Sequence, residues 1–424
     1  MVGLLFPSST TYPGPDTYTG SWLPGGASVS GINLPTTANP NAPTIYTCVI
    51  YKTVTGRIVA ELPLAEQPQW SRQLNQSSQQ TIKLRAGDTA LPPVSRLREL
   101  VVPWFFSAAV LWGTHVCQAG PVLPYNVDDT SNSLLQLGTG DFWSLLSGRL
   151  LANPAWNPAT TGINTTDADV TVTDTLANIA LQLVRNAIGM TYRAGSSLPV
   201  DIPTNTGSGT ITRTYFGYDM NDVATKLHEL TQEVNGPDID FQPYLYQDST
   251  GRYIRHLMRV GRDTDGYLVQ PGTAPVFDYG SSLRSIPISG DGSKMSTTSW
   301  TKGSGDKYSM LYGMASDTTL TDAGWPLVDA VDSSHISSTD QTQLSTWATA
   351  NQALHGKATE QWTAYVDANT NPQLGSYAIG YFGTYNINGH IWLPDQQYSG
   401  RILGIANGRT PGEVVHTIEG RGPF

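Results

Sequence analysis

The sequence has little charge and little cysteine. Charged residues make up 14% of the 424-residue chain, well below the roughly 25% of an average globular protein. This scarcity argues against a charge-rich disordered protein, a coiled coil and a mostly helical domain, because Glu, Lys and Arg normally fill helix surfaces. The two cysteines, Cys48 and Cys117, cannot form a disulfide framework, and no Cys/His cluster has the spacing of a zinc site.

Segments suited to a membrane or to nucleic acid are lacking as well. The longest apolar stretch, 100–116, is interrupted by Pro103, Ser107 and Gly113 and is shorter than the roughly 20 residues that span a bilayer. Residues 1–9 include a short apolar run without a basic leader, so we expect no signal peptide. A net charge of −10 should repel nucleic acid. We expect a soluble protein that neither inserts stably into a membrane nor binds DNA specifically.

Most of the secondary structure that the sequence predicts consists of short β-strands. Glycine and proline, with 42 and 28 residues, divide the chain into short segments. Alternation over 44–52 followed by Thr55-Gly56 predicts a hairpin, and 104–111 with 114–123 predicts a second hairpin that is apolar on both faces and therefore buried. Further strands are expected at 239–245, 253–260, 360–366, 377–387, 391–393, 401–406 and 414–418. The expected fold class is a β-rich α+β protein with several antiparallel β-barrel or sandwich domains and a few packed helices.

Four helices are predicted where a capping residue precedes apolar residues at helical spacing. Their caps are Asp141, Thr173 or Asp174, Asp219 or Asn221, and a residue within 338–340. The second should end at Gly189, and the third, which includes Val234, should end at Asn235-Gly236-Pro237.

These elements divide the chain into four parts. Residues 1–44 form an extended Pro/Gly/Ser-rich N-terminal arm with a single charge, Asp16. Residues 45–155 form a first β domain, 156–275 an α+β domain, and 276–424 a C-terminal β domain with one helix.

The sequence contains no recognisable catalytic or cofactor motif. There is no Gly-x-Ser-x-Gly elbow, and Gly356-Lys357 lacks the upstream glycine of a phosphate-binding loop. The seven histidines are scattered, and His228-Glu229 lacks the second histidine of a metalloprotease helix. We expect no enzymatic activity, no cofactor and no metal.

Three pairs of carboxylates could in principle serve as acid and base in glycoside cleavage. They are Asp128 with Asp129, Asp238 with Asp240, and Asp263 with Asp265. Each pair lies in a turn context, where Asp side chains commonly bond to the backbone. We interpret them as turn residues, with catalysis or calcium binding as the alternative.

Aromatic and basic residues are the other candidates for a binding site. Core positions are expected for Trp104, Trp143, Trp347 and Trp362, which fall on apolar faces. Surface positions suited to stacking on sugars are expected for Trp22, Trp156 and Trp325. A basic run comprises Arg252, Arg255, Arg259 and Arg262. We interpret it as a solvated strand edge whose charges block edge pairing, with a phosphate site as the alternative.

Several short motifs, taken in chain order from about residue 45 to the end, point to a known family. They are Trp70–Asn75, the hairpin running into Ala119–Val122, Gly140–Arg149, Asp219–Tyr244 and Trp325–Leu327. Together they resemble the minor tail proteins of long-tailed actinobacterial phages, which are similar to the tail-tip or baseplate hub of contractile phages.

The resemblance implies a structural virion protein built from β domains related to the tail-tube fold. It would be assembled in the host cytoplasm and located at the distal end of the tail. It implies a homo-oligomeric ring, a trimer, that contacts the distal tail protein ring, the tape-measure protein and the central fibre proteins. Such a ring would gate the passage of DNA through its lumen without binding it specifically. The sequence shows no peptidase or lysozyme-like extension, which agrees with a structural role.

Other functions stay open at this stage. A glycan-binding or cell-wall-degrading tail component is the main alternative, and a secreted β-rich carbohydrate-binding protein is another. Clustered surface tryptophans would favour binding, and facing carboxylates would favour hydrolysis. A run of five acidic residues is either an acidic lumen wall or a solvated face: Asp317, Asp322, Asp329, Asp332 and Asp340.

The arm is expected to contribute to assembly. Its apolar residues are spaced singly or in small groups, too sparsely to close a core but suitably for separate pockets on a neighbouring subunit. Tyr12, Tyr18 and Trp22 are the candidate assembly residues. Burying one such side chain contributes about 1.5–3 kcal/mol, whereas ordering each residue's backbone costs about 1–2 kcal/mol. We therefore expect the arm to lie across a second copy rather than on its own domain.

Overall fold

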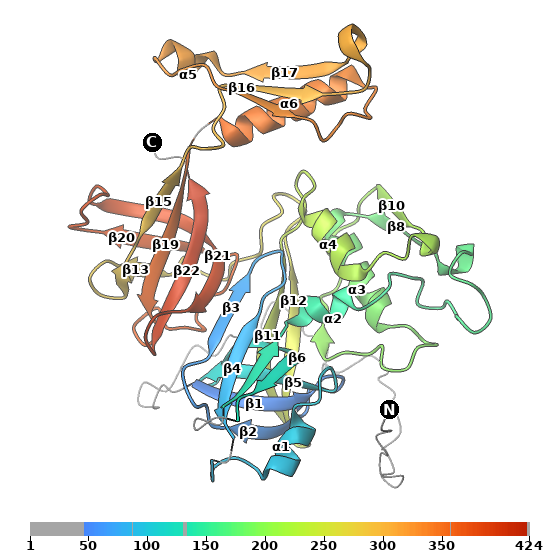
Figure 1. Ribbon diagram of the computed structural model, residues 1–424, viewed down its shortest axis with the longest axis vertical. Coiled ribbons are helices and arrows are strands. Elements are labelled where there is room, and N and C mark those ends of the chain that lie inside the picture. Colours follow the sequence, from blue (N-terminus) through green and yellow to red (C-terminus); the bar gives the residue numbers. More distant parts are fainter. Residues whose placement is uncertain (1–45, 87, 130–133, 357, 422–424) are drawn as a thin grey trace.

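The computed structural model describes residues 46–86, 88–129, 134–356 and 358–421 (Figure 1). The expected β-rich α+β class is confirmed, with large antiparallel sheets and few helices. The arm residues Tyr12, Tyr18 and Trp22 lie outside the described residues. In the part of the chain that is described, no helix is long and apolar enough to cross a membrane.

The N-terminal β unit, residues 46–140, contains both predicted hairpins. Its elements are β1 (Tyr46–Lys52), β2 (Ile58–Leu62), β3 (Gln69–Gln73), β4 (Gln80–Arg85), α1 (Val94–Leu100), β5 (Phe106–Trp112), β6 (His115–Val127) and β7 (Leu134–Thr139). Gly56 and Gly113 adopt φ of 74° and 61° in the two hairpin turns, a conformation that glycine reaches without steric cost. Every residue of β5 is buried, as its mostly apolar sequence predicts. Its polar residue, Ser107, shares a 2.8 Å hydrogen bond with Thr53.

The middle unit, residues 141–275, packs helices against a hairpin. Its main elements are α2 (Phe142–Ser147), β8 (Val170–Asp174), α3 (Leu176–Ile188), β9 (Val200–Asp201), β10 (Ile211–Tyr215), α4 (Val223–Thr231), β11 (Ile239–Asp248) and β12 (Gly251–Val260). Asp141 caps α2 as predicted, and Gly189 ends α3. The caps of α3 and α4 are Thr175 and Asp222, each one residue beyond the predicted positions.

The C-terminal β unit comprises residues 276–291 and 358–421. Its strands are β13 (Val276–Asp278), β14 (Leu283–Ser285), β15 (Ile288–Asp291), β19 (Thr359–Asp367), β20 (Phe382–Ile387), β21 (Gln396–Asn407) and β22 (Glu413–Arg421). Strand β21 pairs with β3, which joins this unit to the N-terminal β unit in one 14-stranded sheet. One hydrophobic cluster also runs through both units and includes Tyr46, Cys117, Phe277 and Tyr377. The two β units therefore form one body.

An inserted unit, residues 292–356, interrupts the C-terminal β unit. Its elements are β16 (Thr298–Lys302), β17 (Tyr312–Ser316), α5 (Thr318–Asp322), β18 (Asp329–Asp332) and α6 (Gln341–His355). Helix α6 packs on β16 and β17 and is capped by Asp340, as predicted. Figure 1 shows this unit, in orange, at the far end of β15 and β19 from the rest of the C-terminal β unit.

Four local predictions are wrong in whole or in part, each because a turn replaces regular structure. The strand expected at 377–387 begins only at Phe382, because the residues before it form a turn. Residues 391–393 form a loop rather than a strand, since His390 Nδ1 accepts the backbone N–H groups of Trp392 and Leu393 at 3.1 and 3.0 Å. Val234 lies beyond the end of α4 and is 89% exposed. Trp104, expected in the core, adopts a φ of 63° in the turn before β5 and is 51% exposed.

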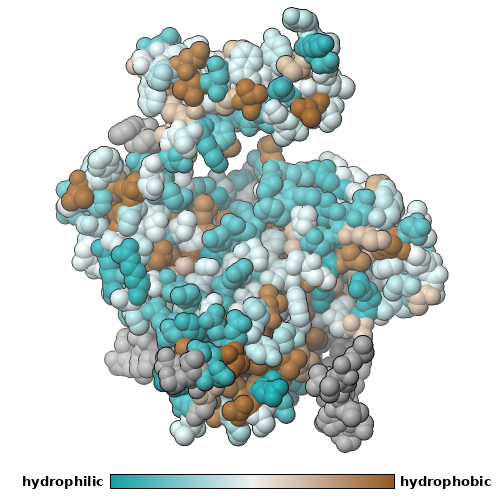
Figure 2. All heavy atoms as spheres, viewed as in Figure 1, coloured by the Kyte–Doolittle hydropathy of each residue, from teal (hydrophilic) through white to brown (hydrophobic). Residues whose placement is uncertain are grey.

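Trp104 belongs to an exposed apolar patch. Val54, Val102 and Phe105 are also exposed, and Figure 2 shows hydrophobic residues gathered at the lower end of the molecule. A bulky residue rarely adopts a positive φ, so the local backbone is strained at this surface.

The register of β15 and β19 predicts that the inserted unit can be removed. Asp291 and Thr359 are direct partners of this antiparallel pair. Replacing residues 292–358 by Asn-Gly would therefore close an ordinary two-residue hairpin. We expect the shortened chain to fold with its circular dichroism otherwise retained and its free energy of unfolding changed by less than about 1 kcal/mol. If the shortened chain fails to fold under conditions in which the full-length chain folds, the inserted unit is needed for the stability of the body.

Candidate functional site: a buried ion network between the units

The candidate site is built on one face of β11. Successive side chains of a strand point to opposite sides, so Asp240 and Gln242 share one face while Ile239 and Phe241 share the other. Asp238 directly precedes the strand. Ile239 and Phe241 pack in the hydrophobic core of the middle unit. Asp238 and Asp240 are only 5% and 4% exposed. The strand and the residue before it therefore turn two carboxylates into the body of the protein, where each needs charged partners.

Asp240 binds two arginines from different units. Its Oδ1 accepts a bond from Arg72 Nη2 of β3 at 2.6 Å, and its Oδ2 accepts one from Arg259 Nη1 of β12 at 3.2 Å. Arg259 Nη1 also donates to the carbonyl of Ile379 at 3.0 Å, and its guanidinium lies 4.8 Å from the centre of the Tyr381 ring. One carboxylate thus ties the N-terminal β unit to the middle unit, and Arg259 extends the connection to the C-terminal β unit.

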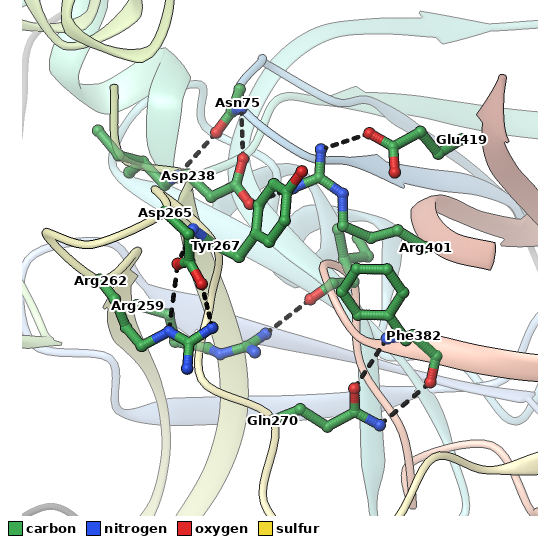
Figure 3. Close-up of polar contacts among 12 residues, drawn as sticks. Asn75, Asp238, Arg259, Arg262, Asp265, Tyr267, Gln270, Phe382, Arg401 and Glu419 are labelled. Atoms are coloured by element: carbon green, nitrogen blue, oxygen red, sulfur yellow. Dashed lines mark hydrogen bonds and ion pairs between the residues drawn. The ribbon is translucent and has the colours of Figure 1, made fainter. Parts of the chain in front are cut away.

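Asp238 makes the matching connection to β21. Its Oδ2 accepts a bond from Arg401 Nη1 at 2.6 Å, and Arg401 Nη2 donates to Glu419 Oε1 at 3.0 Å (Figure 3). The Arg401 guanidinium also lies 4.3 Å from the centre of the Tyr267 ring. We call Arg72, Asp238, Asp240, Arg259, Arg401 and Glu419 the ion network.

Asn75 of the N-terminal β unit forms two hydrogen bonds to the segment that carries Asp238. Its Nδ2 donates to Asp238 Oδ1 at 3.0 Å, and its Oδ1 accepts the backbone N–H of Ile239 at 2.7 Å. Its φ of 63° is one that Asn tolerates better than most residues. Both ends of the side-chain amide are therefore bonded to the start of β11.

The ion network balances three arginines against three carboxylates. Burial raises the pKa of Asp238 above its ordinary value of 3.8, and the attraction of Arg401 and the bond from Asn75 offset this only in part. The folded protein therefore holds this proton more tightly than the unfolded chain. The contribution of Asp238 to stability accordingly declines as the pH rises from 3.8 through its raised pKa.

This geometry favours a connecting role for Asp238 and Asp240 over acid–base catalysis. Both oxygens of each carboxylate accept bonds from protein groups. The adjoining cavity, lined in part by Arg72 and Gln242, has a volume of about 10 Å³, which is the space of one water molecule. A glycoside would need room between two free carboxyl groups. The turn interpretation is wrong for Asp240, because it lies within β11.

The other acidic candidates have local roles. Asp265 pairs with Arg262 in a turn where Gly266 N–H donates to the Arg262 carbonyl at 2.8 Å, so the turn interpretation holds there. In the acidic run, Asp317 and Asp340 cap α5 and α6. Among the described residues, no group of three or more His, Cys, Asp or Glu side chains is placed to hold a metal ion.

The basic run of β12 corrects another interpretation. Strand β12 lies between β11 and β9, and the short β9 pairs with His256 and Leu257. The arginines of β12 and Arg262 beyond its end are ion-paired: Arg252 with Glu61, Arg255 with Asp201, Arg259 with Asp240, and Arg262 with Asp265. The partners of Arg252 and Arg255 are distant in sequence. By contrast, Asp240 lies opposite Arg259 in the β11–β12 hairpin, and Asp265 is three residues from Arg262.

The structure describes two of the three expected surface tryptophans, Trp156 and Trp325, and they lie in different units. Trp156 is buried in the middle unit, where its Nε1 donates to the Thr161 carbonyl at 3.2 Å, so the surface expectation is wrong for it. Trp325 is 48% exposed in the inserted unit, and Trp22 lies outside the described residues. Trp143 and Trp362 are buried as expected. Both cysteines are buried and free.

Removing one charge from the ion network should destabilise the protein strongly. Asp240→Asn leaves Arg72 and Arg259 buried without their counter-charge, so we expect the free energy of unfolding to fall by about 3–5 kcal/mol in urea titrations. Glu99→Gln is the control, because it removes an exposed partner of Arg96 and should change the value by less than about 1 kcal/mol. Equal effects of the two substitutions would contradict the assigned role of the ion network.

No protein-family model matches the chain, and no curated protein matches it in sequence. Solved structures do resemble it. A 43-kDa tail protein of prophage MuSo2 from Shewanella oneidensis aligns with a TM-score of 0.51 at 11% identity, covering 88% of this chain and 98% of that protein. A tail protein from Neisseria meningitidis MC58 aligns with a TM-score of 0.47 at 11% identity, covering 89% and 96%. The first of these likenesses shows that the chain shares the fold of the Shewanella tail protein over nearly its whole length.

Proposed function

We propose that the protein is a structural virion component of a phage tail tip, a hub ring that links the distal tail ring to the central fibre and gates DNA passage. The observation that carries this proposal is the shared fold, which covers 98% of the Shewanella prophage tail protein. Because the identity is 11%, the proposal concerns the architectural role and not individual residues.

The construction of the chain suits a ring wall. The two β units are connected in three ways: by one sheet that continues from β3 to β21, by one hydrophobic cluster, and by the ion network. A part that surrounds a channel has to keep its curvature while DNA and proteins pass, and three independent connections between the β units resist bending. A trimer of such chains would place six β units around the axis and close by heterologous contacts.

The net charge of −10 supports free passage of DNA, since an acidic wall repels phosphates. Partners in this proposal are the distal tail protein ring, the tape-measure protein and the central fibre proteins, with the virion as the location. In this proposal the protein is not an enzyme and uses no cofactor.

Imaging of the native particle tests the role directly. We expect electron cryo-microscopy to show a closed ring of three copies at the distal end of the tail, with an acidic lumen. A single copy per tail, copies stacked along the tail tube, or a basic lumen would contradict the proposal.

The alternative, a wall-degrading or glycan-binding component, makes a separate prediction. Purified protein should leave cell walls intact in a digestion assay, because Asp238 and Asp240 are bound to arginines and Asn75. Clearing that is lost in Asp238→Asn, while Asp265→Asn retains it, would overturn the structural assignment.

A further inference from the structure

A groove of about 400 Å³ runs beside strand β8 in the middle unit. Its lining includes four consecutive residues of β8, Val170–Thr173, together with Gln182 and Asn186 of α3 and the segment Asn153-Pro154. Figure 1 shows β8 and β10 together beside α3 and α4. The groove is therefore bounded by a strand on one side and a helix on the other.

The lining of the groove identifies it with the edge of the strand. A face of a strand presents every second residue, whereas an edge presents the main chain of consecutive residues. Strand β8 pairs with β10 in a two-stranded sheet, and no other strand among the described residues pairs with its second edge. The main-chain N–H and C=O groups of that edge therefore have no strand partner among the described residues.

This edge lacks three of the features by which proteins block strand addition. Exposed edges are commonly protected by Lys, Pro or a bulge, but Val170–Thr173 alternates Val and Thr and contains none of these. The one charged residue of the lining, Asp169, accepts the Gly217 N–H at 2.8 Å. The side-chain amides of Gln182 and Asn186 are joined by a 2.7 Å bond. An uncharged extended peptide matches such a groove, and a saccharide is disfavoured because the lining contains no aromatic ring.

We propose that the arm segment Gly25–Leu34 of a second copy of this chain adds to the free edge of β8 as an extra strand. This segment lies between Pro24 and Pro35, carries no charge, and is the longest proline-free run of the arm. Proline lacks an N–H and ends a ladder, so the two prolines define the limits of pairing. Ten residues exceed the length of β8, which has five.

The tether between the segment and the body restricts the arrangement of the two copies. Residues 35–45 connect Leu34 to Tyr46 and contain Pro35, Pro40 and Pro43, which stiffen them. Fully extended, this tether spans at most about 40 Å, so the accepting groove lies within that distance of the donor's Tyr46. In a ring, each copy then offers its groove to the arm of the copy beside it. The inference concerns association between copies and holds independently of the tail role.

Crosslinking in the full-length protein tests the contact. Ser30→Cys in the arm and Thr173→Cys in β8 place thiols at the two proposed partners, and the native Cys48 and Cys117 are buried. Nitrogen-15-labelled and unlabelled copies are mixed, treated with a short bismaleimide, digested and analysed by mass spectrometry. We expect crosslinked peptides that join a labelled arm to an unlabelled β8. Crosslinks only between peptides of the same label, or none at all, would overturn the proposal.

Two further variants separate strand addition from a general contact. Thr349→Cys in place of Thr173→Cys moves the acceptor to an exposed position on α6 and should abolish the crosslink. Ser28→Pro with Val29→Pro removes two adjacent N–H groups from the segment and should also abolish it, whereas Thr10→Pro with Thr11→Pro should not. A crosslink that survives the first proline pair would show that no added strand forms.

Discussion

The structure depends on the burial of two neighbouring carboxylates, Asp240 of β11 and Asp238 directly before this strand. Taking two charges out of water is costly unless each is paired and hydrogen-bonded, so the fold has to bring arginines to this place. They arrive from β3, β12 and β21, that is, from all three units of the body. A misplaced unit would leave a buried charge without a partner, so the ion network disfavours other ways of docking the units.

The connection between the β units has several physical origins that reinforce one another. The pairing of β21 with β3 supplies main-chain hydrogen bonds, and the common hydrophobic cluster removes apolar surface from water. The ion network adds contacts that form only when particular residues meet. The strands of the inserted unit form a separate three-stranded sheet. In the described part of the chain, none of them pairs with a strand of the body. The chain therefore combines two β units joined in one sheet with an inserted unit that has its own sheet.

Local signals predicted much of the secondary structure because their causes are local. Asp141 and Asp340 cap helices by bonding to N–H groups two or three residues away, and Gly56 turns a hairpin through its own φ. The errors arise where a distant or backbone effect prevails. Trp104 has the hydrophobicity of a core residue but sits in a strained turn, and Trp156, in polar surroundings along the chain, is covered by the packing of the middle unit.

The candidate site shows the limit of local information most clearly. By itself the sequence determined the β-rich class, the main hairpins and helices, and the placing of Asp238 and Asp240 close together, since alternation and capping depend on neighbouring residues. Only the tertiary structure decided that these carboxylates are buried partners of Arg72, Arg259 and Arg401. Arg72 and Arg401 lie 168 and 163 positions from their aspartates, and a charge pair across such a separation forms through the packing of whole units.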